Sequence, residues 1–144
     1  METLEQILEM WKKDSEIDQT EPGRELLNIP KLHNKYLHIL SGHRIASKKC
    51  NFEYYKMKKI KWEYYSGKMS QEELTQRGWE PFRYTLKTDI SIYLDSDPML
   101  QELVKNRSYH EEAIVVVESI MGELKSRTFQ LKDFISWEKF IGGQ

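Results

Sequence analysis

Residues 44–68 read RIASKKCNFEYYKMKKIKWEYYSGK, and this stretch decides both the expected fold and the expected chemistry. It holds eight lysine or arginine side chains against two glutamates, although the chain of 144 residues carries a net charge of −1. Aromatic side chains are distributed through the same residues. Positive charge attracts phosphate groups, and flat aromatic rings stack on unpaired bases. The stretch therefore predicts a binding site for single-stranded nucleic acid.

A helical projection separates the basic side chains of this stretch from the apolar ones. At 100° per residue, most of the lysines share a broad face with two aromatic residues, while apolar residues repeat at intervals of four and three on the other side. Lys61 lies nearer that packed side than Lys59 does. A solvated helix face with aromatic residues packed beneath it is the alternative interpretation, but aromatic residues on the charged face favour nucleic acid. The predicted binding residues are Arg44, Lys48, Lys49, Tyr55, Lys56, Lys58, Lys59, Lys61 and Trp62.

The helical pattern extends well beyond the basic stretch on its N-terminal side. A near-heptad series of apolar residues runs from Leu32 to Tyr64 and predicts a helical arm of about 35 residues that ends at Ser66-Gly67. Pro30 could begin a new helix or kink a longer one, and Ser41-Gly42 could break the arm. A helix of this length needs a hairpin partner or another subunit to cover it.

The N-terminal residues predict a short amphipathic helix and a loop. Thr3 and Gln6 have the spacing of a capping box, which predicts a helix over residues 3–13. Residues 14–23 are expected to form a turn or loop that ends at Pro22-Gly23.

The middle of the chain is harder to interpret than its two ends. Ser70 and Glu73 predict a second capped helix, which ends at Gly78. Residues 79–84 are expected to be an irregular connection. Residues 90–94 alternate like a short strand, but helix or loop is favoured because the rest of the chain is helical. Asp97-Pro98 is a typical helix start.

The C-terminal residues predict a core helix, a bend and a final helix. Val115 to Val117 should lie in the core, and Arg127-Thr128 should mark the bend. The final helix is apolar around so much of its circumference that it should be buried on two sides, one of them against other subunits. A monomer in which the long arm covers this helix is the alternative. The predicted oligomerisation residues are Leu131, Phe134, Ile135, Trp137, Phe140 and Ile141.

Composition favours a mainly all-α protein that forms one structural unit. Residues 1–68 would supply the N-terminal and DNA-binding helices, 69–97 a connection, and 98–144 the oligomerisation region. The single cysteine, Cys50, excludes an internal disulfide. We find neither an apolar run of membrane-spanning length nor a signal peptide, so no membrane association is expected.

The motifs that would indicate an enzyme are missing from the sequence. Gly67-Lys68 lacks the upstream glycine of a phosphate-binding loop, so ATP hydrolysis is not expected. His33, His38 and His43 recur every five residues and are spread around a helix rather than gathered on one face, as metal ligands would be. The sequence predicts neither an enzyme nor a site for a cofactor or a metal.

Several short motifs, in this order and spacing, resemble the UvsY family of recombination mediators of T-even-like bacteriophages. The family has lysine, a small residue, arginine and leucine before an acidic residue and Tyr-Tyr-Ser-Gly; here residues 59–67 read KIKWEYYSG, with Lys61 in place of arginine and Trp62 in place of leucine. The resemblance extends to Lys12-Lys13-Asp14 and to Lys125-Ser126-Arg127.

This resemblance implies a function that the residues alone do not supply. It implies a non-enzymatic mediator in a ring-like homo-oligomer, hexameric or heptameric, that works in the cytoplasm of the bacterial host. Such a mediator binds single-stranded DNA and helps a RecA-like phage recombinase load where a single-strand-binding protein already sits. Two alternatives remain open from the sequence: a helical protein-interaction adaptor, and an RNA-binding oligomer, since nothing in the sequence distinguishes the two nucleic acids.

Overall fold

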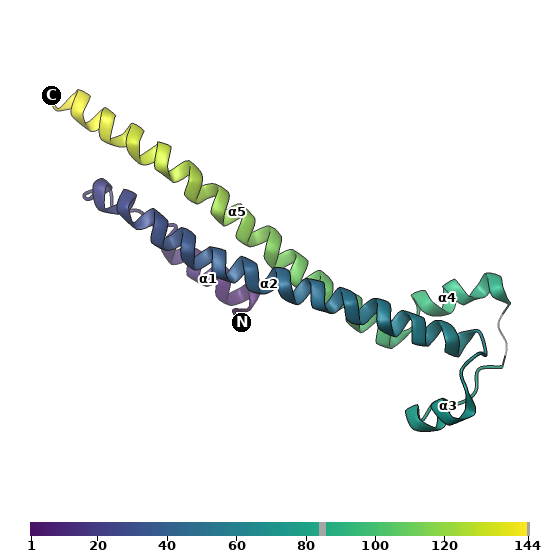
Figure 1. Ribbon diagram of the computed structural model, residues 1–144. Coiled ribbons are helices and arrows are strands. Elements are labelled where there is room, and N and C mark those ends of the chain that lie inside the picture. Colours follow the sequence, from purple (N-terminus) through teal and green to yellow (C-terminus); the bar gives the residue numbers. More distant parts are fainter. Residues whose placement is uncertain (84–85, 144) are drawn as a thin grey trace. The chain divides into compact units, whose positions relative to one another are not determined.

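The computed structural model describes residues 1–83 and 86–143, and every regular element in them is helical, which confirms the all-α prediction (Figure 1). Tyr84, which falls in the predicted irregular connection, lies outside the described residues. None of the described helices is long and apolar enough to cross a membrane. In chain order the elements are α1 (Leu4–Asp14), α2 (Pro22–Tyr65), α3 (Gln71–Arg77), the 3₁₀ helix η1 (Lys87–Asp89), α4 (Ile90–Asp95) and α5 (Pro98–Ile141).

The short helices begin where the capping signals predict. The Thr3 side chain accepts the N–H of Gln6, and the Gln6 side chain accepts the N–H of Thr3, so that α1 has a complete capping box. The Ser70 side chain accepts the N–H of Glu73 at the start of α3. This helix ends at Gly78, whose φ of 69° lies in the left-handed region that glycine adopts without steric cost.

Helix α2 is longer than predicted, because it runs through both places where the sequence left an interruption open. It begins at Pro22 rather than after Gly23, since a proline at the first helical position lacks only an N–H that would have no partner there. Pro30 lies inside the helix, and the 44 residues run on through Gly42. The loop prediction for residues 14–23 is therefore wrong at its C-terminal end.

Helix α5 is also one continuous element of 44 residues. Asp97 caps its start, as predicted, by accepting the N–H groups of Met99 and Leu100 at 2.9 and 3.0 Å. The bend predicted at Arg127-Thr128 is wrong, because no residue there removes a helix hydrogen bond and the helix continues through the buried Arg127.

The chain divides into two compact units, and each long helix contributes to both. Unit 1 contains residues 1–45 and 110–144, and unit 2 contains residues 46–109. These boundaries differ from those of the predicted segments 1–68, 69–97 and 98–144. The segments assign a function to each part of the chain, and that assignment stays a prediction.

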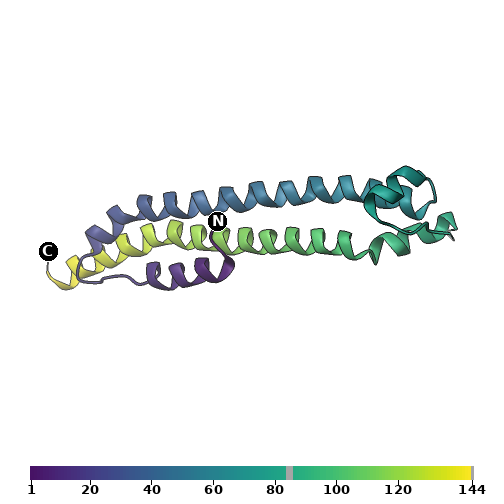
Figure 2. The same cartoon turned by 90° about the horizontal axis from the view of Figure 1, so that it is seen from below.

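Three helices build the core of unit 1, where α1 lies along α2 and α5 (Figure 2). Ile7 from α1, Tyr36 from α2 and Val117 from α5 are fully buried in this core. Val115 was expected in the core but is exposed, because the helical period turns it away from Val117.

Polar contacts inside unit 1 join its helices. Asp14, the last residue of α1, accepts hydrogen bonds from Lys35 Nζ at 2.6 Å and Tyr36 Oη at 2.8 Å. Burial, followed by the hydrogen bond to Asp14, raises the pKa of Tyr36. Arg127 is buried with its guanidinium over the Trp11 ring, 5.4 Å from the ring centroid.

A histidine pair joins α2 to α5 in the same unit. His43 is buried; its Nδ1 lies 2.9 Å from Nδ1 of His110, and its Nε2 lies 2.9 Å from the carbonyl oxygen of Glu2. Burial, and then the neighbouring His43, lower the pKa of His110.

Candidate nucleic-acid interface

Five exposed residues follow one line along the part of α2 that belongs to unit 2. Their spacing alternates between four and three residues, which keeps them within about 80° of the helix circumference. All five side chains are exposed, and basic and aromatic residues alternate along much of the line. We call this line the basic-aromatic stripe; its residues are Lys48, Phe52, Tyr55, Lys59 and Trp62.

The lysines of the stripe have further positive charge beside them. Lys49 and Lys56 are exposed along one edge, and Glu53 is the exposed acidic residue nearest to them on the helix. Among the described residues, none of these lysines, nor Lys48 or Lys59, has an ion-pair partner of its own. Unpaired ammonium groups on one helix face can neutralise phosphates with little rearrangement.

The three aromatic residues of the stripe differ in how open their rings are. Phe52 is 73% exposed, Tyr55 58% and Trp62 40%. Tyr55 contacts the neighbouring Tyr54 edge to face, with ring centroids 5.3 Å apart. Lys68 Nζ lies 4.6 Å from the centroid of the Trp62 ring. The Phe52 ring has no such neighbour among the described residues.

Arg44 and Lys58 are two predicted binding residues that are not part of the stripe. Arg44 belongs to unit 1, where its guanidinium is 2.8 Å from a carboxylate oxygen of Glu118. Lys58 is half-buried, with Nζ 5.8 Å from the centroid of the Tyr54 ring. Both side chains therefore have neighbours in the folded chain that the sequence pattern does not reveal.

Lys61 also lies off the stripe, and it is buried. Its side chain leaves the helix on the packed side, where Nζ is 2.9 Å from Oδ2 of Asp97. The Tyr65 hydroxyl donates to the same oxygen at 2.6 Å, and the Trp79 ring centroid is 4.1 Å from Nζ. Lys61 is thus held by groups of its own unit rather than turned toward solvent, so we leave it out of the proposed interface.

Charge and hydrogen bonding balance at Asp97. Burial raises the pKa of this carboxyl group, but hydrogen bonds from Tyr65, Lys61 and the N–H of Leu100 outweigh burial, and the pKa lies below its ordinary value. Since its other oxygen caps α5, Asp97 joins the end of α2 to the start of α5 within unit 2.

An aromatic cluster surrounds this ion pair. The Tyr64 ring packs against Trp79, with ring centroids 5.1 Å apart, and Tyr65 stacks on Tyr93 at 5.6 Å. Phe82 contacts Tyr65 edge to face. Tyr64 and Tyr65, near the C-terminal end of the basic stretch, are therefore packing residues of unit 2.

Phe52 is the residue of the stripe that the sequence-based prediction omits. A signal for it was available, because it lies four residues after Lys48 and three before Tyr55, the same spacing that joins the others. Cys50 lies on the opposite side of the helix and is half-buried.

The predicted oligomerisation residues range from buried to exposed in the single chain. Leu131 is buried in its own chain, and Phe134 and Ile135 are half-buried. The last three side chains are exposed, and the rings of two of them stack at 5.8 Å. The exposed residues are Trp137, Phe140 and Ile141.

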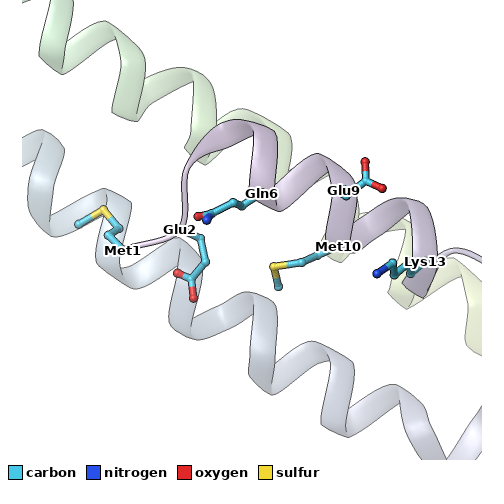
Figure 3. A pocket seen from close by; sticks show the side chains of 6 residues that line it. All are labelled: Met1, Glu2, Gln6, Glu9, Met10 and Lys13. Carbon is cyan, nitrogen blue, oxygen red and sulfur yellow. The ribbon is translucent and has the colours of Figure 1, made fainter.

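The described residues outside the stripe were also searched for catalytic and metal-binding groups. A pocket of about 540 Å³ is lined by residues of α1 and the N-terminus, and Figure 3 shows their side chains, among them Glu2, Gln6, Glu9 and Lys13. Its lining contains no serine, threonine, cysteine or histidine. No group of three or more metal-ligating side chains occurs in residues 1–83 and 86–143.

Comparison with known proteins identifies both the class and the family of this chain. The class is that of recombination and repair proteins, and not that of enzymes. The chain belongs to the UvsY family, described as "Recombination, repair and ssDNA binding protein UvsY", which matches residues 10–144.

Solved structures agree in fold with this chain. One crystal structure of the bacteriophage T4 recombination mediator protein UvsY has a TM-score of 0.85 and 23% identity, and the match covers 99% of each chain. A second crystal form of that protein has a TM-score of 0.80 at 23% identity, covering 92% of this chain and 96% of the other. No curated protein sequence matches.

Proposed function

We propose that this protein binds single-stranded DNA along the basic-aromatic stripe and that it acts as a recombination mediator. The observation that supports the proposal most directly is a group of exposed lysines on one helix of unit 2, Lys48, Lys49, Lys56 and Lys59, which form no ion pair with any described residue. Exposed aromatic residues between these lysines supply flat surfaces on which unpaired bases can stack. A duplex offers no unpaired bases, so these surfaces favour single strands. Membership of the UvsY family supports the same ligand.

The mediator activity would follow from organising the bound strand. Several copies in a homo-oligomer, hexameric or heptameric, would multiply weak contacts through effective concentration. DNA held in this way could favour the binding of a RecA-like phage recombinase where a single-strand-binding protein already covers the strand. The protein would then act in the cytoplasm of the bacterial host, without a nucleotide cofactor of its own.

A salt titration with two lysine variants tests the binding surface. Lys48→Ala combined with Lys59→Ala should weaken binding of labelled single-stranded DNA. The slope of log Kobs against log salt concentration should fall by roughly 0.7 for each phosphate that the variant no longer neutralises. Lys105→Ala is the matched control, because Lys105 is exposed in unit 2 but lies on α5, off the stripe.

Unchanged affinity and slope in a folded double variant would reject the assigned surface. Duplex DNA and RNA of equal length complete the experiment: equal binding of RNA would favour an RNA-binding protein, and no binding of any nucleic acid would favour the adaptor. Recombinase loading on strands coated with single-strand-binding protein then tests the mediator activity, which should be absent from the double variant.

A further inference from the structure

We propose that Phe52 is the main base-stacking residue of the stripe, with Tyr55 as its neighbour. This inference rests on the proposed function. It adds that the unpaired bases of the DNA, which stack on Phe52, give the stripe its preference for single strands. It names a residue outside the family's basic motif, which aligns with residues 59–62.

The surroundings of Phe52 fit a base better than water or protein. Phe52 is 73% exposed as a residue, and its side chain leaves a large apolar surface in solvent. Lys48 lies four residues before it and Lys56 four residues after it, one turn away on either side. A base stacked on the ring would therefore have its flanking phosphates within reach of both ammonium groups.

The other two aromatic residues of the stripe are less available for stacking. The cation of Lys68 lies over the Trp62 ring, and a base that stacks on that face would have to displace it. Tyr55 is exposed but rests against Tyr54, which fixes the orientation of its ring. Phe52 can accept a base without displacing a neighbour from its ring.

The spacing along the helix matches neighbouring nucleotides. Phe52 and Tyr55 are three residues apart, a rise of about 4.5 Å, against about 3.4 Å between stacked bases of one strand. The stripe from Lys48 to Trp62 covers fourteen steps, or about 21 Å, which is room for roughly six stacked nucleotides. A six-nucleotide strand should therefore occupy one stripe.

A second copy of the chain is the competing occupant of this surface. Lysines on both sides of Phe52 argue against it, because two stripes packed together would bring like charges into contact. Charge complementarity instead favours a polyanion that carries flat apolar groups, which describes single-stranded DNA.

The decisive measurement compares a six-residue oligothymidylate with a six-residue abasic deoxyribose phosphate of the same charge. Phe52→Ala should weaken binding of oligothymidylate by roughly 5-fold or more and leave binding of the abasic strand unchanged. Phe52→Leu should behave like Phe52→Ala, whereas Phe52→Trp should retain affinity, since stacking needs a ring. The salt slope should stay constant, because no charge is removed.

Ile92→Ala is the control, since Ile92 is an exposed apolar residue of unit 2 outside the stripe. Equal affinity of wild type and Phe52→Ala for oligothymidylate would overturn the stacking role alone and leave the proposed function intact. Equally weakened binding of both strands would overturn it in favour of an indirect effect, and a change in sedimentation would overturn it in favour of a subunit interface. A wild-type protein that binds neither strand would overturn the proposed function, and this inference with it.

Discussion

At the scale of single residues, two lysines two positions apart have opposite environments. Two residues are about 200° apart around a helix, so that Lys59 is exposed on the stripe while Lys61 is buried beside Asp97. The sequence indicates that Lys61 lies nearer the packed side, but the identity of its partner could not be predicted, because Asp97 is 36 positions further along the chain.

We predict that Lys61→Ala destabilises the protein by about 3–5 kcal/mol, because it leaves a buried carboxylate without its cation. Lys59→Ala should change stability by less than about 0.5 kcal/mol, as expected of a surface substitution. Urea denaturation followed by circular dichroism measures both. Equal stability of the two variants would show that the Lys61 ion pair does not hold unit 2 together.

At the scale of elements, local signals located most helix starts but not the lengths of the long helices. The caps at Thr3, Ser70 and Asp97 were predictable because they depend on residues three or four apart. The continuity of α2 through Pro30, and of α5 through Arg127, depends instead on packing in unit 1. Tertiary contacts decide such cases, and a single sequence does not show them.

The histidine pair between α2 and α5 makes the stability of unit 1 depend on pH. Because a carbonyl oxygen only accepts, Nε2 of His43 donates to Glu2, and Nδ1 of His43 must then accept from Nδ1 of His110. Since the pKa of His110 is lowered in the folded state, the unfolded chain binds more protons below about pH 6.5, and stability falls as pH falls through that value.

We therefore expect the melting temperature to drop between pH 7.5 and pH 5.5, and His110→Gln to reduce this drop because glutamine can donate without titrating. His33→Gln, at an exposed position of α2, is the control. Parallel pH profiles for wild type and His110→Gln would contradict the assignment.

At the scale of the whole molecule, the family and the basic segment could be predicted, and the division into units could not. Charge density along α2 is a local property of the sequence, so that four of the nine predicted binding residues fall on the stripe, with Lys49 and Lys56 beside it. Unit 1 combines residues 1–45 with residues 110–144, and unit 2 is the continuous segment between them, so that a linear division at residues 68 and 97 does not correspond to the units.

Assembly is the prediction that belongs to this scale. Trp137→Ser with Phe140→Ser removes two exposed stacked rings and should give a smaller sedimenting species that binds DNA more weakly, since multivalency is reduced. Leu131→Ala is the informative contrast: this side chain is buried in its own chain, so its truncation should cost about 2–5 kcal/mol of folding stability. A double serine variant that keeps the wild-type sedimentation would exclude the C-terminal rings from the subunit interface.

The position of Cys50 has a practical consequence. It is the chain's single cysteine, half-buried on the side of α2 that faces away from the stripe. A thiol-reactive probe would therefore attach at one known place without any engineered cysteine, clear of a strand bound to the opposite side. Because the residue is half-buried, its rate of alkylation depends in part on local opening of unit 2. The alkylation rate of Cys50, measured with and without DNA, therefore reports whether DNA binding reduces local opening of unit 2.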